Sequence, residues 1–286
     1  MIPDYAAPNA LYIVDLSAFV HRFWHVGPNF AARNFAQMIG KLVGTRGPAR
    51  MVLAEDTMFP TFRHDLMAGH GAGYKGTRPE VSAAERASKL EQLRLGAEYV
   101  EKAHGMMRLW AKGFEADDVI ATLAQWGLEE GLHVVVLGFD KDLLQLVGPS
   151  CVLWDGKGAP TGPAEVHEKF GVTPAQIVDY LAIVGDKTDN VTGIRGVGEV
   201  GARQILERFG RLDVAIHEAN ETGPDRGANH PFFAGKPALW AKLVASKPAA
   251  DFARSLVRLR RDVPLPILSL DELTLSAAAP EAEVEP

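Results

Sequence analysis

Acidic residues at short spacing are the residues of this sequence that could do chemistry. Glu115, Asp117 and Asp118 stand together at the start of a segment whose apolar residues recur at helical spacing. Acids are favoured in a first helical turn because the helix dipole and the free N–H groups attract negative charge there, which explains one or two of them. Further acids stand directly after apolar runs elsewhere in the chain, and a site for divalent metal ions is the simplest explanation of that recurrence.

The candidate metal ligands share a carboxylate that stands at a strand end, at a helix start or in a loop. They are Asp15, Asp56, Glu115, Asp117, Asp118, Asp140, Asp142, Asp186 and Asp189. Hard oxygen ligands without a Cys or His cluster favour Mg²⁺ or Mn²⁺ over Zn²⁺. Two such ions about 4 Å apart can clamp a phosphodiester, one activating a water molecule and the other stabilising the leaving oxygen. Each acid alone is more simply a helix cap or a solvated loop residue, so the prediction rests on the whole set.

Apolar runs that end in these acids predict the strands that position them. Segments 11–14, 51–54 and 133–137 are short and apolar, and each is followed by acids. Helical patterns at 82–104 and 116–130 lie between them, which predicts an open α/β fold with a mainly parallel central sheet flanked by helices. Ligands bind beyond the carboxyl ends of the strands in such sheets, and the acids stand there.

Residue alternation decides between two neighbouring acids after the second strand. Side chains of a strand point alternately to opposite faces, so Glu55 and Asp56 cannot both face one site. We favour Asp56 as the ligand.

The segment 59–78 differs in character from the rest, and we expect its glycine-rich part, 67–76, to be mobile. Arg63, Lys75 and Arg78 flank its glycines. They are either solvated surface charges or cations that grip a scissile phosphate and stabilise its developing charge. Tyr74 either stacks on an exposed base or packs against the loop.

A second glycine-rich run, 185–201, lies between two predicted helices and has the form of a helix-hairpin-helix. Its candidate DNA-binding residues are Gly193, Arg195, Gly196, Gly198, Gly201 and Arg203. Glycines let the backbone approach a phosphate closely, and the following helix presents its N–H end. The glycine string also resembles a dinucleotide-binding loop, but it does not follow an apolar strand as that loop does. Its place after a helix suits a grip on a duplex backbone.

The composition describes a globular protein with a large core. The chain has 286 residues, of which 47% are hydrophobic, and a formal net charge of -6. Negative charge argues mildly against nucleic-acid binding, but acids that converge on metal ions are largely neutralised. No apolar stretch reaches the ~18 residues that span a membrane, and the N-terminus has no secretory pattern. The single cysteine, Cys151, indicates a reducing compartment. We therefore expect a cytoplasmic monomer with no membrane partner.

Composition and element order also predict three regions. Residues 10–172 form an α/β domain that holds the metal site, and residues 173–265 form a helical domain with the helix-hairpin-helix. Residues 266–286 are a tail, which ends in an acidic stretch that we expect to be disordered.

Taken together, the motifs resemble the bacterial 5′-nuclease family, which has a PIN-like fold. The family includes the flap endonucleases and the N-terminal 5′→3′ exonuclease domain of DNA polymerase I. The motifs are Asp15 after an apolar strand, Asp56 with Phe62-Arg63 beyond it, Tyr74-Lys75 with Arg78, Phe114 to Asp118, Asp140 to Leu146, and Gly185 to Asn190. The similarity runs from about Leu11 to Leu265 and covers nearly all of the chain.

The resemblance implies a Mg²⁺-dependent hydrolase that cuts DNA near a 5′ flap, nick or 5′ overhang, and RNA–DNA hybrids as well, in primer removal and repair. It implies two Mg²⁺ ions, for which Mn²⁺ can substitute, a helical arch over the single-stranded 5′ end, and a helix-hairpin-helix that holds duplex DNA, often with a K⁺ ion. By matching position, the ligands of the first metal region are Asp15, Asp56, Glu115, Asp117 and Asp118. Those of the second are Asp140, Asp142, Asp186 and Asp189, and Arg63, Lys75 and Arg78 match cations at the base of the arch.

The sequence departs from the family pattern in two places. Gly138-Phe139 stands where the family usually has Thr-Gly or Thr-Ala, and a glycine-rich insertion at 67–73 bears on how the arch orders. No polymerase domain follows, so we expect the protein to act alone or with a separate DNA polymerase.

Two other functions remain open at this point. A PIN-like ribonuclease would share the acidic site and prefer RNA, while a non-catalytic protein that binds branched DNA would not need the full set of acids.

Overall fold

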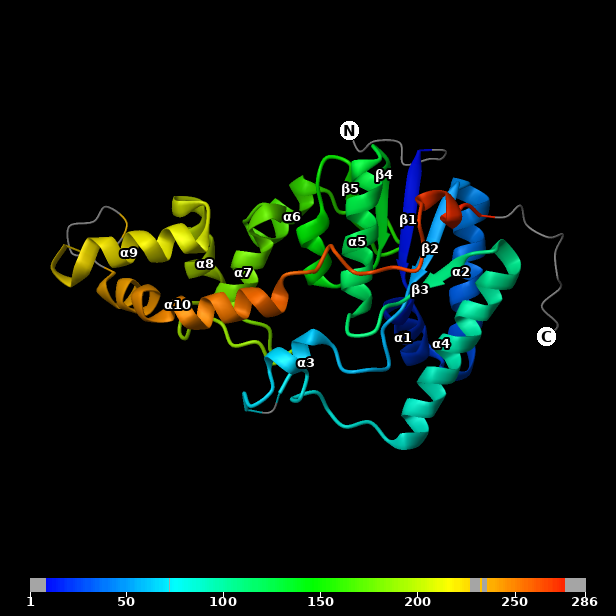
Figure 1. The fold of residues 1–286 in the computed structure, drawn as a ribbon, viewed down its shortest axis with the longest axis horizontal. Coiled ribbons are helices and arrows are strands. Elements are labelled where there is room, and N and C mark those ends of the chain that lie inside the picture. The colour runs from blue at the N-terminus through cyan, green and yellow to red at the C-terminus, as the bar shows by residue number, and fades with distance from the viewer. Residues whose placement is uncertain (1–8, 72, 227–231, 233–235, 276–286) are drawn as a thin grey trace. The chain divides into compact units, whose positions relative to one another are not determined.

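The computed structural model divides the chain into two compact units, which Figure 1 shows as a ribbon. The residues that the structure describes are 9–71, 73–226, 232 and 236–275. Unit 1 comprises Met1–Phe62, Glu80–Gly162 and Leu259–Pro286, and unit 2 comprises Arg63–Pro79 and Pro163–Arg258. The acidic stretch at the end of the predicted tail lies outside the described residues.

Unit 1 is built on a five-stranded parallel sheet. Its strands are β1 (Ala10–Asp15), β2 (Arg50–Ala54), β3 (Met107–Leu109), β4 (His133–Leu137) and β5 (Cys151–Trp154). They lie in the order β3-β2-β1-β4-β5, and every pair is parallel. The predicted strands β1, β2 and β4 are confirmed, while β3 was not predicted. The order reverses between β1 and β4, which is where ligands bind in open α/β sheets.

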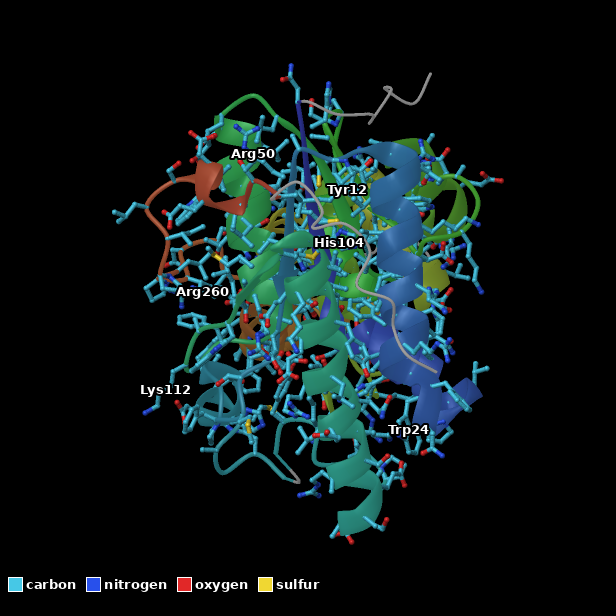
Figure 2. The ribbon with its side chains drawn as sticks, turned by 90° about the vertical axis from the view of Figure 1, so that its right-hand side faces the viewer. Tyr12, Trp24, Arg50, His104, Lys112 and Arg260 are labelled. Carbon is cyan, nitrogen blue, oxygen red and sulfur yellow. The ribbon has the colours of Figure 1, made fainter. Side chains whose placement is uncertain are left out.

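Helices cover both faces of this sheet. On one face pack α1 (Leu16–Val26), α2 (Ala31–Arg46) and α4 (Ala83–His104), and on the other packs α5 (Ala116–Glu129). Figure 2 shows α2 and α4 lying side by side. The two predicted helices, α4 and α5, are confirmed to within one residue at each end. The Ser82 hydroxyl caps α4 by accepting the N–H of Glu85 at 3.1 Å.

Alternation along β1 explains how the core forms on both faces. Tyr12 and Val14 are buried in one cluster with Phe19 of α1 and Phe35 of α2. The intervening residue Leu11 points to the opposite face and reaches α5. The carboxyl end of β1 is therefore fixed by packing on both sides, and Asp15 with it.

Unit 2 is mainly helical. Its helices are α6 (Pro163–Phe170), α7 (Ile177–Val184), α8 (Glu199–Phe209), α9 (Leu212–Arg226) and α10 (Pro237–Val257), and α3 (Phe62–Leu66) begins at the unit boundary. α9 ends at Arg226, and residues 227–231 and 233–235 lie outside the described residues. α10 ends at Val257, because the chain leaves helical geometry at Arg258. In the described part of the chain, no helix is both long and apolar enough to cross a bilayer.

Gly127 lets α5 approach the sheet closely, and this gives a test of the packing. A Cβ atom there would lie 3.0 Å from Val134 and 3.1 Å from Leu11, whereas one at the exposed helical Gly44 would meet nothing within 4 Å. Gly127→Leu should lose about 1–3 kcal/mol through overpacking, which lowers Tm by several degrees. Gly44→Leu should raise Tm slightly, because leucine favours a helix more than glycine does. Equal Tm values for the two variants, measured by circular dichroism, would contradict this packing.

Candidate metal centre

Three predicted ligands cap or bridge the elements that end at the carboxyl edge of the sheet. Asp15, the last residue of β1, is buried, and its carboxylate accepts the N–H of Ala18 at 2.9 Å, which caps α1. Asp56 follows β2 and accepts the N–H of Ala116 at 2.9 Å. Glu115 is the N-cap of α5 and is also buried. Helix starts therefore hold all three carboxylates at this edge.

Asp117 lies at the centre of an accumulation of negative charge within unit 1. Burial raises the pKa of its carboxyl well above its ordinary value, and the charges of four neighbouring acids raise it further. In decreasing order of effect these are Asp140, Asp15, Asp142 and Asp56. We call these five residues the acid cluster. Carboxylates that repel one another where they are partly desolvated are stabilised by a cation, and their hard oxygens suit a divalent metal ion.

Asp118 has a different environment from its neighbour. It is fully buried, and its two oxygens accept the N–H groups of Glu115 at 3.2 Å and Arg260 at 2.9 Å. The Arg260 bond fastens the C-terminal segment of unit 1 to the start of α5. Asp118 therefore acts as a structural acceptor, whatever part it has in metal binding. Sequence reasoning did not find this role, because the bond joins residues far apart in the chain.

Glu55, which we set aside in favour of Asp56, pairs with a cation. One of its oxygens lies 3.5 Å from Nε of Arg108, and that arginine also contacts Glu101 at 3.3 Å. Burial raises the pKa of the Glu55 carboxyl, and the arginine opposes the shift. The geometry thus gives Glu55 a partner of opposite charge.

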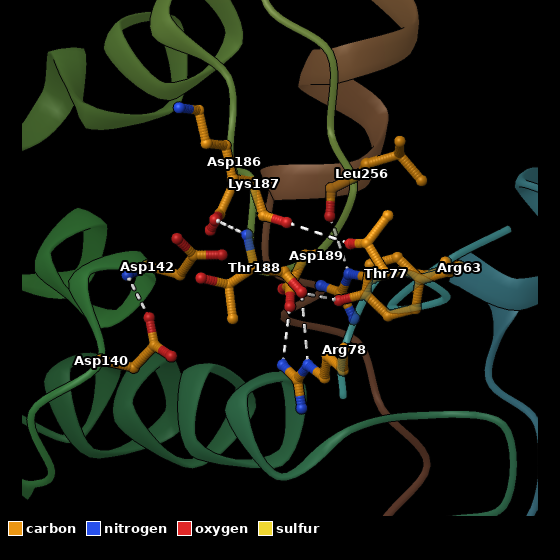
Figure 3. Close-up of polar contacts among 11 residues, drawn as sticks. Arg63, Thr77, Arg78, Asp140, Asp142, Asp186, Lys187, Thr188, Asp189 and Leu256 are labelled. Carbon is orange, nitrogen blue, oxygen red and sulfur yellow. Dashed lines mark hydrogen bonds and ion pairs between the residues drawn. The ribbon is translucent and has the colours of Figure 1, made fainter. Parts of the chain in front are cut away.

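The other two predicted ligands, Asp186 and Asp189, lie in one loop of unit 2 that follows α7. The backbone of Asp186 pairs with Val191 in an antiparallel bridge, and its carboxylate accepts the N–H of Thr188 at 2.8 Å. Asp189 accepts Nη2 of Arg78 at 2.7 Å on one oxygen and the Tyr74 hydroxyl at 3.1 Å on the other. Figure 3 shows Arg78 turned toward Asp189.

The segment 73–78 is fastened to this loop along its length. The N–H of Lys75 donates to the Asp189 carbonyl at 3.2 Å, and the side chain of Asn190 donates to the Gly73 carbonyl at 2.9 Å. Thr77 and Arg78 donate to carbonyls of residues 187 and 188, each at 3.3 Å. The predicted cations Lys75 and Arg78 are therefore brought together with the predicted ligand Asp189.

Arg63 corrects one prediction. We expected a cation that grips a phosphate, but the residue is only 2% exposed. Its Nε donates to the Leu256 carbonyl at 2.7 Å and its Nη2 to the Arg258 carbonyl at 3.4 Å. These carbonyls lie at the C-terminus of α10, where the helix dipole favours a positive charge. In this structure Arg63 is a buried cap of α10 and presents no surface to a phosphate.

Tyr74 corrects a second prediction. Of the two interpretations, base stacking is wrong for this conformation, because the side chain is 7% exposed. Its hydroxyl binds Asp189, and its ring meets His64 edge to face with centroids 5.3 Å apart. Tyr74 therefore packs against the loop and positions Asp189.

The glycines of the hairpin between α7 and α8 fall into two groups. A Cβ atom at Gly193 would lie 2.3 Å from the Ile183 carbonyl, so this glycine is required for the hairpin to close on α7. A Cβ atom at Gly198, the N-cap of α8, would meet nothing within 4 Å, which leaves the start of that helix open. The carbonyl of Gly196 accepts Nζ of Lys242 at 2.8 Å. Gly198 therefore has the open space that a close approach of a phosphate needs, whereas Gly193 does not.

The remaining predicted hairpin residues differ in exposure. Arg195 is exposed, while Arg203 is half-buried and pairs with Glu199 at 3.2 Å. Gly201 lies in the first turn of α8, where a Cβ atom would lie 2.9 Å from Val197. The loop thus offers Arg195 and the start of α8 to a ligand.

Comparison with known families agrees with this arrangement. The model of the 5′-3′ exonuclease N-terminal resolvase-like domain matches residues 10–171, and that of the 5′-3′ exonuclease C-terminal SAM fold matches residues 172–281. The chain belongs to the 5′-3′ exonuclease family. The resemblance predicted from the motifs is thereby confirmed.

Curated relatives of the chain are bacterial DNA polymerases. It is 30% identical over 276 residues to the thermostable DNA polymerase I of Thermus aquaticus. The match covers 93% of this chain and 30% of that protein. It is 34% identical over 284 residues to DNA polymerase I of Rhizobium leguminosarum, with 93% and 26% covered. The chain therefore corresponds to less than a third of the length of these relatives.

Solved structures share the fold. The T5 5′-exonuclease with bound divalent metal ions (zinc) is 23% identical with a TM-score of 0.71, over 87% of this chain and 89% of that one. The T5 flap endonuclease in a complex with DNA and metal ions is 22% identical with a TM-score of 0.70, over 87% and 88%. The catalytic core of Rad2 with DNA substrate is 16% identical with a TM-score of 0.60, over 97% and 85%. The predicted PIN-like α/β fold is confirmed.

The acid cluster predicts that neutralising Asp117 stabilises the metal-free protein. Because the pKa of Asp117 is raised by folding, its ionisation destabilises the metal-free native state as the pH rises from near 3.8 through the raised pKa. Asp117→Asn should therefore raise Tm at pH 7 in EDTA by at least about 2 °C, and the gain should vanish at low pH. Mg²⁺ should raise Tm of the wild type more than that of the variant. Glu129→Gln, an exposed acid of the same helix, is the control and should change neither value.

The different environments of two arginines predict losses of stability of different size. Arg63→Met removes the buried partner of two carbonyls and should cost on the order of 2–5 kcal/mol of stability. Arg78→Met removes a half-exposed ion pair, with side-chain exposure of 48%, and should cost at most about 1 kcal/mol. Urea denaturation measures both. A stable Arg63→Met protein would contradict the buried cap.

Proposed function

We propose that this protein is a structure-specific 5′-nuclease that hydrolyses phosphodiesters near the 5′ end of flapped, nicked or 5′-overhanging DNA. Its membership of the 5′-3′ exonuclease family supports the reaction class. The observation that carries the proposal is the acid cluster, which gathers five carboxylates at the reversal point of a parallel sheet. A non-catalytic DNA-binding protein would have no use for charge that opposes a polyanion.

We propose Mg²⁺ as the cofactor, in two ions, with Mn²⁺ as a substitute. The ligands would be the acid cluster with Glu115 and Asp118, and, in unit 2, Asp186 and Asp189. All of these offer carboxylate oxygens, which suit either ion. When bound, the ions would supply an activated water and stabilise charge on the leaving oxygen. A K⁺ ion at the hairpin stays a prediction.

The protein's own residues would hold and orient the strand. Arg78 lies at the surface, and its bond to Asp189 keeps the guanidinium directed toward the acids of the unit 2 loop. A phosphate oxygen can accept from the same fork of N–H groups, so Arg78 can hold the phosphate during cleavage. Lys75, on the adjoining turn, would add a second positive charge. Arg63 has no such part, because it caps α10.

Duplex binding would fall to the open part of the hairpin. The start of α8 at Gly198 and the exposed Arg195 offer N–H groups and positive charge to a backbone phosphate. Gly193, Gly201 and Arg203 would shape the loop from within.

The cellular setting is proposed by analogy with the relatives. The chain matches less than a third of the length of proteins named DNA polymerase I, so we propose that it works in the bacterial cytoplasm, as a monomer, in primer removal and repair together with a DNA polymerase. RNA–DNA hybrids would be further substrates.

A cleavage assay tests the proposal. Labelled 5′-flap DNA, the matching RNA flap and single-stranded DNA are incubated with the protein in Mg²⁺ or in EDTA. We expect cleavage near the flap junction, in Mg²⁺ only, with DNA flaps preferred to single strands. Asp117→Asn should lower kcat by at least about 100-fold, as loss of an electrostatic catalytic group does, and leave flap binding within a few-fold.

The control is Glu129→Gln, which should cleave as the wild type does. Preferential cleavage of RNA flaps would identify a PIN-like ribonuclease instead. Wild-type rates in Asp117→Asn would show that the acid cluster is not the active site.

A further inference from the structure

Phe139 is an exposed aromatic residue directly beyond the buried end of β4. Leu137, the last residue of the strand, is fully buried, whereas Phe139 is 45% exposed. The next residue is Asp140, a member of the acid cluster, and Cα atoms of neighbouring residues lie ~3.8 Å apart. Phe139 therefore stands at the carboxyl edge of the sheet, at the rim of the candidate metal centre.

The ring of Phe139 is held in place by two residues of α1. The guanidinium carbon of Arg22 lies 4.8 Å from the centroid of the Phe139 ring and 4.7 Å from that of Phe19. The two rings meet edge to face at 80°, with centroids 5.7 Å apart. Phe19 is fully buried, so it anchors this stack in the core. The ring of Phe139 is thus held in one orientation, and its partners leave part of the ring exposed.

Arg22 is itself fixed. Its Nη2 donates to the Asp155 carbonyl at 2.8 Å, and its Nη1 lies 4.0 Å from the Asp155 carboxylate. Asp155 directly follows β5, so strand ends on both sides of Phe139 determine where the guanidinium lies. A positive charge is held beside the exposed ring.

This combination suits a nucleotide better than an apolar partner. An aromatic face next to a guanidinium can take a base by stacking and favours the phosphate that accompanies it. The adjacent acids would repel that phosphate unless cations were bound to them. Base stacking and ion binding would therefore act together on the same nucleic-acid strand. Trp110 is as exposed, at 46%, but it follows β3 at the far end of the sheet order.

We propose that Phe139, backed by Arg22, stacks a nucleobase next to the phosphate that is cut and so positions the scissile strand. The proposal rests on the proposed nuclease function and adds a binding residue to it. Stacking on a fixed ring restrains the sugar and phosphate that follow the base, which keeps the scissile bond in register with the acid cluster.

Substrates that lack a single base test this role. A series of 5′-flap DNAs carries one abasic residue at each position around the cut. For the wild type, an abasic residue at one of these positions should reduce kcat/KM by about 5- to 150-fold. This range corresponds to the stacking of one base on an aromatic ring. Phe139→Ala should show this loss with intact DNA, and its kcat/KM should not fall further when that base is absent.

Phe139→Leu separates stacking from packing, because leucine still covers Phe19 and Arg22 but has no aromatic face. It should keep a Tm within a few degrees of the wild type and lose the same factor in kcat/KM as Phe139→Ala. Trp110→Ala is the matched control and should keep the full abasic penalty. If Phe139→Leu cleaves intact DNA as the wild type does, or if the abasic penalty persists in Phe139→Ala, the stacking role is overturned.

Failure of the proposed function is distinguishable in the same experiment. A wild-type protein that cuts no flap in Mg²⁺ contradicts the nuclease proposal. A protein that cuts flaps but shows no abasic penalty dependent on Phe139 contradicts only the stacking role.

Discussion

Repulsion among carboxylates that the fold holds together is the constraint on which the rest of the structure depends. Burial and the charges of four neighbouring acids raise the pKa of Asp117. Such an arrangement is unfavourable alone, so the scaffold must keep the acids from separating. Parallel strands meet this need, because β1 and β4 are buried on both faces and cannot shift without breaking the core. The rigid sheet thus holds the acids close together, and their mutual repulsion favours the binding of a cation.

Residues of one chemical type take opposite roles because their surroundings differ. Asp117 and Asp118 are neighbours, yet Asp118 satisfies two backbone N–H groups while Asp117 faces other acids. Arg63 and Arg78 show the same contrast, since one is buried under α10 and the other lies at the surface. A buried charge is tolerated when hydrogen bonds satisfy it, and then it contributes to folding.

Local patterns predicted the parts of the fold that local physics determines. The strands β1, β2 and β4 are continuous apolar runs, and α4 is delimited by Ser82 and by Gly105 with φ of 63°. The strand β3 escaped prediction because three residues, one of them the charged Arg108, carry no periodic signal.

The sequence predicted the acids of the candidate site but not the burial of the residues around them. Acids at strand ends were recognisable, because the carboxyl edge of a parallel sheet gathers whatever follows its strands. The burial of Arg63 and Tyr74 was not, since their partners at Leu256 and Asp189 lie 193 and 115 residues away. A sequence shows that a residue is charged or aromatic, but only tertiary contacts decide whether it is exposed.

Two residues of unit 2 have a strained backbone conformation. Among the described residues, Lys75 and Asn190 are the non-glycine residues with positive φ, at 55° and 59°. This conformation costs about 1 kcal/mol or more for a residue with a Cβ atom. The two positions lie in facing segments, and hydrogen bonds from Lys75 N–H and the Asn190 side chain join them. The strain is therefore offset by the contacts that hold Lys75 and Arg78 beside Asp189, so the cations are placed by the folded backbone before any substrate arrives.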